Sequence, residues 1–136
     1  MHALKTFLVE DSPVILQSLI ATLEELAPVE VVGIAEDERK AVQWLSEPGN
    51  KAQLVIVDIF LSGGSGLGVL KAAHQMHQGR HLVVLSNYAT KDMRTRCLAL
   101  GAERVFDKST EIDALIQYCI ELAPQSRGSI PAELRE

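Results

Sequence analysis

The sequence predicts an α/β fold, a doubly wound, five-stranded parallel sheet with helices on both faces. Short aliphatic runs, which are typical of strands buried on both sides, alternate strictly with segments whose apolar residues recur at helical spacing. The alternation occurs five times, and strands that alternate with helices in this way form parallel sheets. Right-handed crossovers and the doubly wound preference favour the flavodoxin-like strand order 2-1-3-4-5.

Caps and turns define the elements in the first half of the chain. Ser12 before Pro13 is typical of a helix start, and Asp37 is a suitable N-cap for the second helix. Glu30 and Gly33 indicate that the second strand lies at an edge of the sheet. The predicted ranges are strand 4–10, helix 13–26, strand 29–35, helix 38–47 and strand 54–57.

The second half of the chain continues the alternation. Thr90 is suited to cap the fourth helix, Gly101 is the glycine expected after that helix, and Ser109 or Thr110 is expected to cap the fifth. The predicted ranges are a third helix ending near residue 76 or 77, strand 82–85, a helix between 90 and 101, strand 104–107 and a helix that includes 112–120. The residues expected to face the core from the second, third and fifth helices are Val42, Leu45, Leu67, Leu70, Ile112, Leu115, Ile116, Cys119 and Ile120.

Length and composition predict one globular domain. The chain has 136 residues, and we expect the domain to cover 1–123 and a polar, flexible tail to cover 124–136. A net charge of −5 without any run rich in lysine or arginine argues against direct binding of nucleic acid. No apolar run approaches a membrane span, and the N-terminus lacks the pattern of a secretion signal. Cys97 and Cys119 are expected to be reduced, buried thiols of a cytoplasmic protein.

Polar residues stand where four of the predicted strands end: Glu10 and Asp11, Asp58, Ser86, and Lys108. The carboxyl ends of parallel strands meet at one edge of a sheet, where open α/β proteins bind their ligands. Three carboxylates close together repel one another, so the site favours a hard divalent cation such as Mg²⁺. Beside a metal, Asp58 is suited to act as the nucleophile toward a phosphoryl group, whose oxygens Lys108 and Ser86 are suited to hold.

The same residues carry a resemblance to a known family. Together, in this order and at this spacing, the strand-end motifs resemble those of the bacterial two-component response-regulator receiver domain of the CheY-like superfamily. The resemblance covers about residues 4–123. None of the motifs is specific alone. They are Val9-Glu10-Asp11-Ser12, Val57-Asp58, Leu85-Ser86 and Phe106-Asp107-Lys108-Ser109.

The resemblance implies a role for each acid. Asp58 would be the phosphoacceptor, which makes the protein a phosphoprotein carrying an aspartyl phosphate. Asp11 would bind Mg²⁺ directly, together with Asp58, and Glu10 would act on the metal through water. The main-chain carbonyl of Phe60 would complete the protein ligands of the metal.

Two further matches and three departures concern signal transmission. Ser86 matches the hydroxyl residue that reorients on phosphorylation, and Lys108 matches the lysine that contacts the phosphoryl group. The departures from the family pattern leave the phosphorylation chemistry unchanged. They concern the relay of the signal from the hydroxyl residue to an aromatic residue, and the lifetime of the phosphorylated state. Asn87 replaces a small residue, Val105 stands at the aromatic switch position with Phe106 beside it, and Ser109 replaces a proline.

The function implied by the resemblance is that of a phosphoacceptor switch in a two-component phosphorelay. A sensor histidine kinase or a phosphotransfer protein would donate the phosphoryl group, and the domain would catalyse only its own phosphorylation and dephosphorylation. The fourth helix, fifth strand and fifth helix would present the changed surface to a downstream protein, which the sequence does not identify. We expect a monomer or weak dimer without a membrane or nucleic-acid partner, either a stand-alone receiver, a relay intermediate or a piece of a longer regulator.

Three alternative interpretations stay open at this point. The first is a receiver fold that acts as an unphosphorylated adaptor through protein–protein contacts. A phosphatase of the haloacid-dehalogenase type would need its nucleophile after the first strand and a second aspartate two residues on, where this chain has Pro13. A flavin or nucleotide carrier would need a phosphate-cradling first loop, which this chain lacks.

Two other groups of residues could be taken for ligand sites. Gly63, Gly64 and Gly66 fit neither common phosphate-loop pattern, so we expect a flexible β–α loop beside the site. His74 and His77 stand three residues apart on the predicted third helix without a further ligand nearby. We expect them to be packed or solvent-exposed and not to bind a metal.

Overall fold

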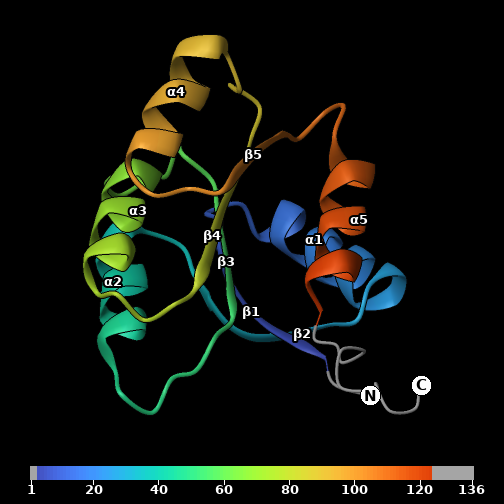
Figure 1. Cartoon of the computed structure of the whole chain (residues 1–136), viewed down its shortest axis with the longest axis horizontal. Coiled ribbons are helices and arrows are strands. Elements are labelled where there is room, and N and C mark those ends of the chain that lie inside the picture. Colours follow the sequence, from blue (N-terminus) through green and yellow to red (C-terminus); the bar gives the residue numbers. More distant parts are fainter. Residues whose placement is uncertain (1–2, 124–136) are drawn as a thin grey trace, which may run out of the picture.

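The fold is a parallel five-stranded sheet between two layers of helices (Figure 1). The computed structural model describes residues 3–123. The strands are β1 (Leu4–Val9), β2 (Val29–Ala35), β3 (Leu54–Val57), β4 (His81–Ser86) and β5 (Arg104–Asp107). Their order is β2-β1-β3-β4-β5 and all pairs are parallel, so the predicted fold class, strand order and edge position of β2 are confirmed.

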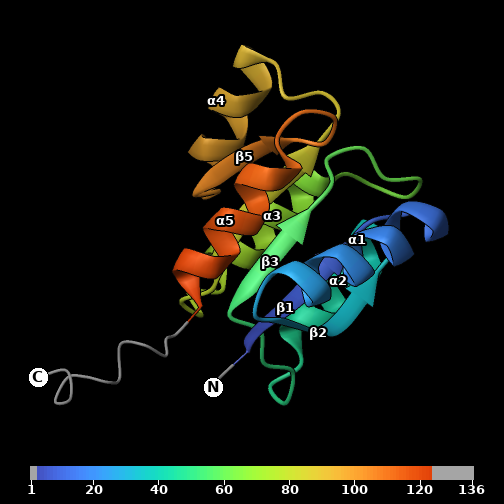
Figure 2. The ribbon, with the colours of Figure 1, turned by 90° about the vertical axis from the view of Figure 1, so that its right-hand side faces the viewer.

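The helices divide between the two faces of the sheet. They are α1 (Pro13–Leu26), α2 (Glu38–Ser46), α3 (Gly66–Gln75), α4 (Lys91–Ala99) and α5 (Ile112–Leu122). Helices α2, α3 and α4 lie on one side, and α1 and α5 lie on the other (Figures 1 and 2). Because strand side chains alternate, Phe7 and Val9 of β1 join the core under α2–α4, whereas Leu4 and Leu8 join the core under α1 and α5.

Local sequence accounts for most helix ends. The side chains of Ser12, Asp37 and Thr90 each accept a main-chain N–H from the first turn of the helix that follows, as predicted. Gly101 follows α4 with a φ of 109°, in the left-handed region that glycine occupies without strain. Several other predicted bounds differ from the observed ones by one residue, which is the usual uncertainty of element ends.

The predicted cap of the last helix was wrong. The N-cap of α5 is Glu111, whose side chain makes no capping hydrogen bond. Neither Ser109 nor Thr110 takes that place, since both lie in the turn after β5. In this turn the Asp107 carboxylate accepts both the N–H and the hydroxyl of Ser109, at 2.8 and 2.6 Å. The chain therefore makes a tight turn after β5 before the helix begins.

Two core assignments were wrong in detail. On α2, Ala41 is fully buried and Val42 only half-buried, because the helix lies with the Ala41–Leu45 line against the sheet. On α5, Ile120 is 39% exposed, since the buried line runs through Leu115 and Cys119. Periodicity alone gives the apolar face of a helix but not the line of closest contact within it.

Three expectations concern the chain as a whole. Across residues 3–123, no helix combines the length and apolar character needed to cross a membrane. Cys97 and Cys119 are buried free thiols, as predicted. The tail predicted for residues 124–136 lies outside the described residues.

The strand registers bring four strand ends to one edge of the sheet. Val9 pairs with Val57, and Val57 pairs with Val84. On the far strand, Ser86 pairs with Asp107. The segments that follow β1, β3, β4 and β5 therefore emerge side by side.

Candidate functional site

Three carboxylates from two strand ends meet at this edge. One carboxylate oxygen of each of Glu10, Asp11 and Asp58 lies within 4.8 Å of the others. Glu10 and Asp58 are only 4% and 9% exposed, and Asp11 is half-buried. The Asp58 N–H donates to the Val9 carbonyl at 3.0 Å, which extends the β1–β3 pairing to the acid itself. The acids therefore lie together, as the strand order implies.

Lys108 provides the positive charge of this cluster. Its Nζ lies 2.7 Å from Glu10 Oε1 and 3.4 Å from Asp58 Oδ2, and its side chain is 12% exposed. The Lys108 main-chain N–H donates to the Ser86 carbonyl at 3.0 Å, so the segment after β5 is bonded to the end of β4. We call Glu10, Asp11, Asp58 and Lys108 the acidic site.

Burial and neighbouring charge shift the pKa of two of these groups. Burial raises the pKa of Asp58 above its ordinary value, and the charge of Glu10 adds to the increase, while the charge and hydrogen bond of Lys108 act against it without cancelling it. For Lys108, burial alone would lower the pKa, but the hydrogen bonds and charges of Glu10 and Asp58 together raise it above its ordinary value. The lysine is therefore held in its charged form by the two acids.

The donor set of the acidic site fits a hard divalent cation. Carboxylate oxygens are the ligands that Mg²⁺ prefers, and a dication would offset the repulsion that one lysine leaves among Glu10, Asp11 and Asp58. Within residues 3–123, these three acids are the only cluster of acidic, histidine or cysteine side chains close enough to hold a metal. His74 and His77 do not belong to such a cluster. Both are exposed, which is one of the two placements expected for them.

The hydrogen bonds of Glu10 bear on which acid would hold the metal directly. Its Oε1 accepts Lys108 Nζ, and its Oε2 accepts the Ser12 N–H at 3.0 Å. Both carboxylate oxygens are thus already engaged. Asp11 is the acid of this strand end better placed to bind a metal directly, and the contribution of the Phe60 carbonyl stays a prediction.

The acidic site lines a pocket of about 200 Å³. Phe60, after β3, and Tyr88, after β4, bring two aromatic rings to it, with centroids 4.7 Å apart in an edge-to-face arrangement. Both side chains are more than half exposed. Ile15 of α1 also lines the pocket and is 38% exposed. The lining residues are Glu10, Asp11, Ser12, Ile15, Asp58, Phe60, Asn87, Tyr88 and Lys108.

Ser86 lies next to this pocket but does not line it. Its side chain is fully buried, and its Oγ accepts the Tyr88 N–H at 3.0 Å. Asn87 takes the place on the pocket wall. A hydroxyl accepts and donates at the same time, so the bond from Tyr88 leaves the proton available for a phosphoryl oxygen. That role of Ser86 stays a prediction.

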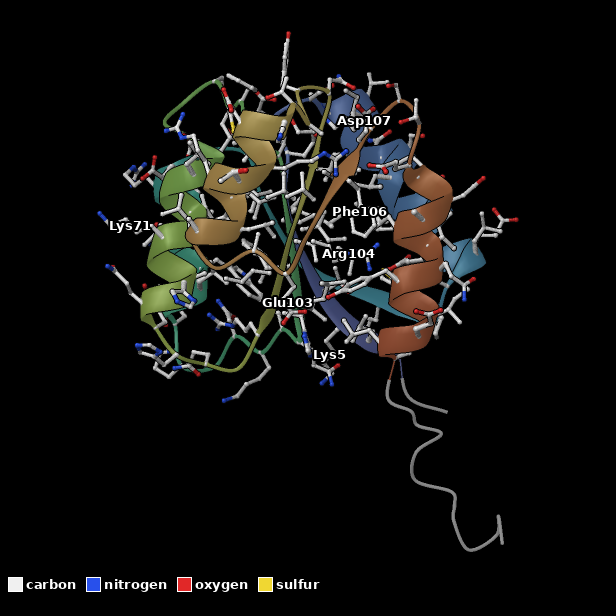
Figure 3. The ribbon with its side chains drawn as sticks, turned by 45° about the horizontal axis from the view of Figure 1, so that its top comes forward. Lys5, Lys71, Glu103, Arg104, Phe106 and Asp107 are labelled. Atoms are coloured by element: carbon white, nitrogen blue, oxygen red, sulfur yellow. The ribbon has the colours of Figure 1, made fainter. Side chains whose placement is uncertain are left out.

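Val105 and Phe106 face opposite sides of the sheet. Val105 belongs to the core under α2–α4, and Phe106 belongs to the core under α5, where its ring lies 5.7 Å from that of Tyr118. Figure 3 labels Glu103, just before β5, and Arg104, Phe106 and Asp107 of the strand, with Asp107 at its carboxyl end. The aromatic side chain therefore faces away from α4, and an aliphatic one faces toward it.

The glycine-rich segment after β3 makes a compact connection. Phe60 and Ser65 form an antiparallel bridge, and the Ser65 N–H donates to the Glu38 carboxylate at 2.9 Å. A Cβ at Gly66 would collide with the main-chain carbonyl of Asp58. The glycine is thus required for close packing of the loop against the strand end.

Two polar residues close to the site were not found by sequence analysis. Arg94 of α4 lies with Nη2 3.0 Å from Glu111 Oε1, and the same Glu111 oxygen accepts the Asp107 N–H at 2.8 Å. Neither residue belongs to a motif, and no periodicity relates them. Their contact depends on how α4 packs beside β5, for which the sequence holds no local signal.

Comparison with known proteins gives a consistent result. The family profile of the response regulator receiver domain matches residues 6–120. Among curated proteins, the transcriptional regulatory protein CitB of Klebsiella pneumoniae is 26% identical over 133 residues, an alignment that covers 96% of this chain and 54% of that protein. The chain thus spans about half the length of this relative.

Solved structures share the fold at lower sequence identity. The receiver domain of the putative response regulator NarL from Mycobacterium tuberculosis matches with a TM-score of 0.77 and 19% identity, over 90% of this chain and 100% of that one. The response regulator domain of Thermotoga maritima CheB matches with a TM-score of 0.76 and 19% identity, over the same shares of the two chains.

Proposed function

This chain belongs to the response regulator receiver domain family, and we propose that it accepts a phosphoryl group on Asp58 in a Mg²⁺-dependent reaction and then changes its surface. The observation that carries the proposal is the acidic site, in which three carboxylates lie within 4.8 Å and a lysine contacts two of them. Buried like charges are costly to keep together, and such arrangements concentrate at functional sites. A bound metal ion and a phosphoryl group would make use of the charge gathered in the acidic site.

The proposed reaction forms an acyl phosphate on Asp58. A carboxylate oxygen attacks the phosphorus, the bond from phosphorus to the donor atom breaks with its electrons staying on the donor, and the donor then takes up a proton. Asp58 must be ionised to attack, and the positive charge of Lys108, 3.4 Å from Asp58 Oδ2, favours the ionised form. When bound, Mg²⁺ would neutralise charge on the carboxylates and the phosphoryl oxygens.

The remaining residues of the site have roles that follow from their positions. The Lys108 ammonium, which the acids keep protonated, would move from Glu10 and Asp58 to a phosphoryl oxygen. Ser86 would donate its hydroxyl proton to a second oxygen. The rings of Phe60 and Tyr88 would restrict the approach of water to the pocket.

The proposal extends to the partners of the chain. The donor would be a sensor histidine kinase or a phosphotransfer protein, in a cytoplasmic two-component system. The domain acts as a signalling module, and its only catalysis would be its own phosphorylation and dephosphorylation. With a net charge of −5, this chain would recognise a protein and not DNA as its direct output partner.

Intact mass spectrometry tests the proposed function. After incubation with acetyl phosphate and Mg²⁺, the protein is expected to gain one increment of about 80 Da, the mass of a single phosphoryl group. Asp58→Asn, or removal of Mg²⁺, should abolish the increment. Asp107→Asn is the matched control, because Asp107 is also an aspartate at a strand end but is bonded to Ser109 outside the pocket, and it should retain uptake.

Two results would contradict this function. An increment retained in Asp58→Asn would place the acceptor elsewhere. No increment in the unmodified protein, with no binding of Mg²⁺ either, would favour the alternative of an unphosphorylated adaptor.

A further inference from the structure

Arg94 joins three segments of the chain through one side chain. Its Nε donates to the Ala89 carbonyl at 3.0 Å, in the loop before α4. Its Nη1 donates to the Val105 carbonyl in β5 at 2.8 Å, and its Nη2 donates to Glu111 Oε1 at 3.0 Å. The planar guanidinium is suited to this arrangement, because it offers several N–H groups in fixed directions.

Glu111 extends this contact to the segment that carries Lys108. The Glu111 oxygen bonded to Arg94 also accepts the Asp107 N–H at 2.8 Å, and the Glu111 N–H donates to the Asp107 carbonyl at 2.8 Å. Asp107 directly precedes Lys108, whose own N–H is bonded to the Ser86 carbonyl. The main chain next to the lysine is therefore held from two sides, by β4 and by Glu111.

No other side chain of α4 makes a comparable bond. Among the hydrogen bonds of residues 3–123, Arg94 is the only α4 side chain bonded to β5 or α5. The side chain of β5 that faces α4 is the aliphatic Val105, and the aromatic ring of Phe106 lies on the other face. Polar contact between α4 and the β5–α5 segment thus passes through Arg94.

We propose that Arg94 and Glu111 are positioning residues for Lys108, and that their contact links the acidic site to α4. A displacement of Lys108 toward a phosphoryl group would strain the Asp107 N–H bond to Glu111. Because the same oxygen holds Arg94, the displacement would reach α4 and the Ala89 loop. The link to phosphorylation rests on the proposed function, whereas the positioning of the Asp107–Lys108 main chain does not.

The first experiment measures the positioning in unphosphorylated protein without Mg²⁺. Amide hydrogen exchange is followed by NMR at Asp107 and, as a reference for global stability, at Ile56 in the core of β3. Glu111→Ala removes the acceptor, and exchange at Asp107 should accelerate roughly tenfold relative to Ile56, as expected for the loss of a hydrogen bond to a charged group. Arg94→Met should accelerate exchange at Asp107 less, because the Glu111 acceptor is still present and has lost only its bond to Arg94.

Matched variants separate this effect from general changes. Arg96→Met alters an exposed arginine of the same helix, and Asp113→Ala alters an exposed acid in the first turn of α5. Both should leave the exchange ratio unchanged. Arg94→Lys keeps the charge but cannot reach three acceptors with one ammonium group, so it should resemble Arg94→Met. Unchanged exchange at Asp107 in both Glu111→Ala and Arg94→Met would overturn the positioning role.

The second experiment tests the link to α4. With acetyl phosphate and Mg²⁺, the amide signals of Met93 and Cys97 should shift in the unmodified protein and in Arg96→Met. In Arg94→Met the mass increment should still appear but the α4 shifts should be lost. Equal α4 shifts with and without Arg94 would overturn the link. If the unmodified protein takes up no phosphoryl group, the proposed function fails, while the exchange experiment still decides the positioning role.

Discussion

Two charged clusters lie close together at the same edge of the sheet, and they are built in opposite ways. The acidic site sets three carboxylates against one lysine, so it carries excess negative charge, and its lysine and two of its acids are largely buried. The contact of Arg94 with Glu111 has one charge of each sign, and the two side chains are 36% and 38% exposed. One cluster is buried and unbalanced, whereas the other is balanced and partly in solvent.

This difference distinguishes two uses of charge. The unbalanced acidic site is suited to chemistry, whereas the balanced Arg94–Glu111 pair holds secondary-structure elements together. Burying unbalanced charge costs stability, so an unbalanced site persists where something else, such as a metal or a phosphoryl group, completes it. A balanced pair at the surface costs little and contributes little through its charge. The contribution of this pair is geometric, because the planar Arg94 guanidinium fixes the directions of its bonds to three oxygens.

Lys108→Met should produce the largest effect on stability. The variant leaves three carboxylates without their counter-charge, and without Mg²⁺ the free energy of unfolding should fall by roughly 3 kcal/mol, as for other buried ion pairs that lose one partner. Added Mg²⁺ should stabilise this variant more than the unmodified protein, because the site has become more negative. Urea denaturation with and without Mg²⁺ measures both changes.

Lys71→Met provides the control, because Lys71 is an exposed lysine on α3 (Figure 3). It should change stability by less than about 0.5 kcal/mol. An equal loss in the two lysine variants would show that the acidic site is not electrostatically unbalanced.

Asp58→Asn should have an intermediate effect of the opposite sign. A carboxyl whose pKa is raised on folding binds protons more tightly in the folded state, so its ionisation lowers stability as pH rises from the ordinary value of 3.8 through the folded pKa. Without Mg²⁺ at neutral pH, the variant should therefore be more stable by about 1 kcal/mol, the usual scale of single substitutions. The advantage should shrink as pH falls toward 4.

Asp107→Asn is the matched comparison for the pH dependence. Hydrogen bonds from Ser109 lower the pKa of Asp107, so its ionised form stabilises the fold above the ordinary pKa. This variant should lose stability at neutral pH, and the loss should disappear on acidification. Denaturation curves between pH 4.5 and 7.5 would contradict the comparison if the two asparagine variants changed in the same direction.

Arg94→Met should change stability far less than Lys108→Met, by no more than Asp58→Asn does. Because the Arg94–Glu111 pair is partly exposed, its ion pair adds only a few tenths of a kcal/mol, and the bonds to the Ala89 and Val105 carbonyls bring the expected loss to about 1 kcal/mol. Added salt should reduce only the share of the stability loss that comes from the ion pair, and not the share from the hydrogen bonds to the two carbonyls. A loss as large as that of Lys108→Met would remove the distinction between the two clusters. Denaturation in low and high salt, with Arg96→Met as control, measures it.

Much of the fold could be predicted because its signals are local. Ser12, Asp37 and Thr90 cap helices by accepting the N–H three residues further along the chain, and the buried strands are continuous apolar runs. The prediction failed at α5 because one local contact and one contact between elements replaced the expected caps. Ser109 was drawn into a turn by Asp107, and Glu111 was drawn to Arg94, so neither contact could be anticipated from the spacing of possible caps.

The acidic site could be predicted although its residues are far apart in the chain. Lys108 and Glu10 are 98 positions apart, yet a general rule on parallel sheets places strand ends together. Details beyond that rule could not be predicted. The side chain of Ser86 is buried beside the pocket instead of lining it, and Ile15 of α1 contributes to the pocket wall.

The sequence by itself determined the alternation of strands and helices, the strand order and the gathering of three acids and a lysine at one edge. These follow from periodicity, capping and topology, which depend on neighbouring residues or on rules common to all parallel sheets. Only the tertiary structure decided that Arg94 reaches Glu111 and that Phe106 faces away from α4. Such contacts depend on the rotation and depth at which each helix packs on the sheet, and that is set by the whole core.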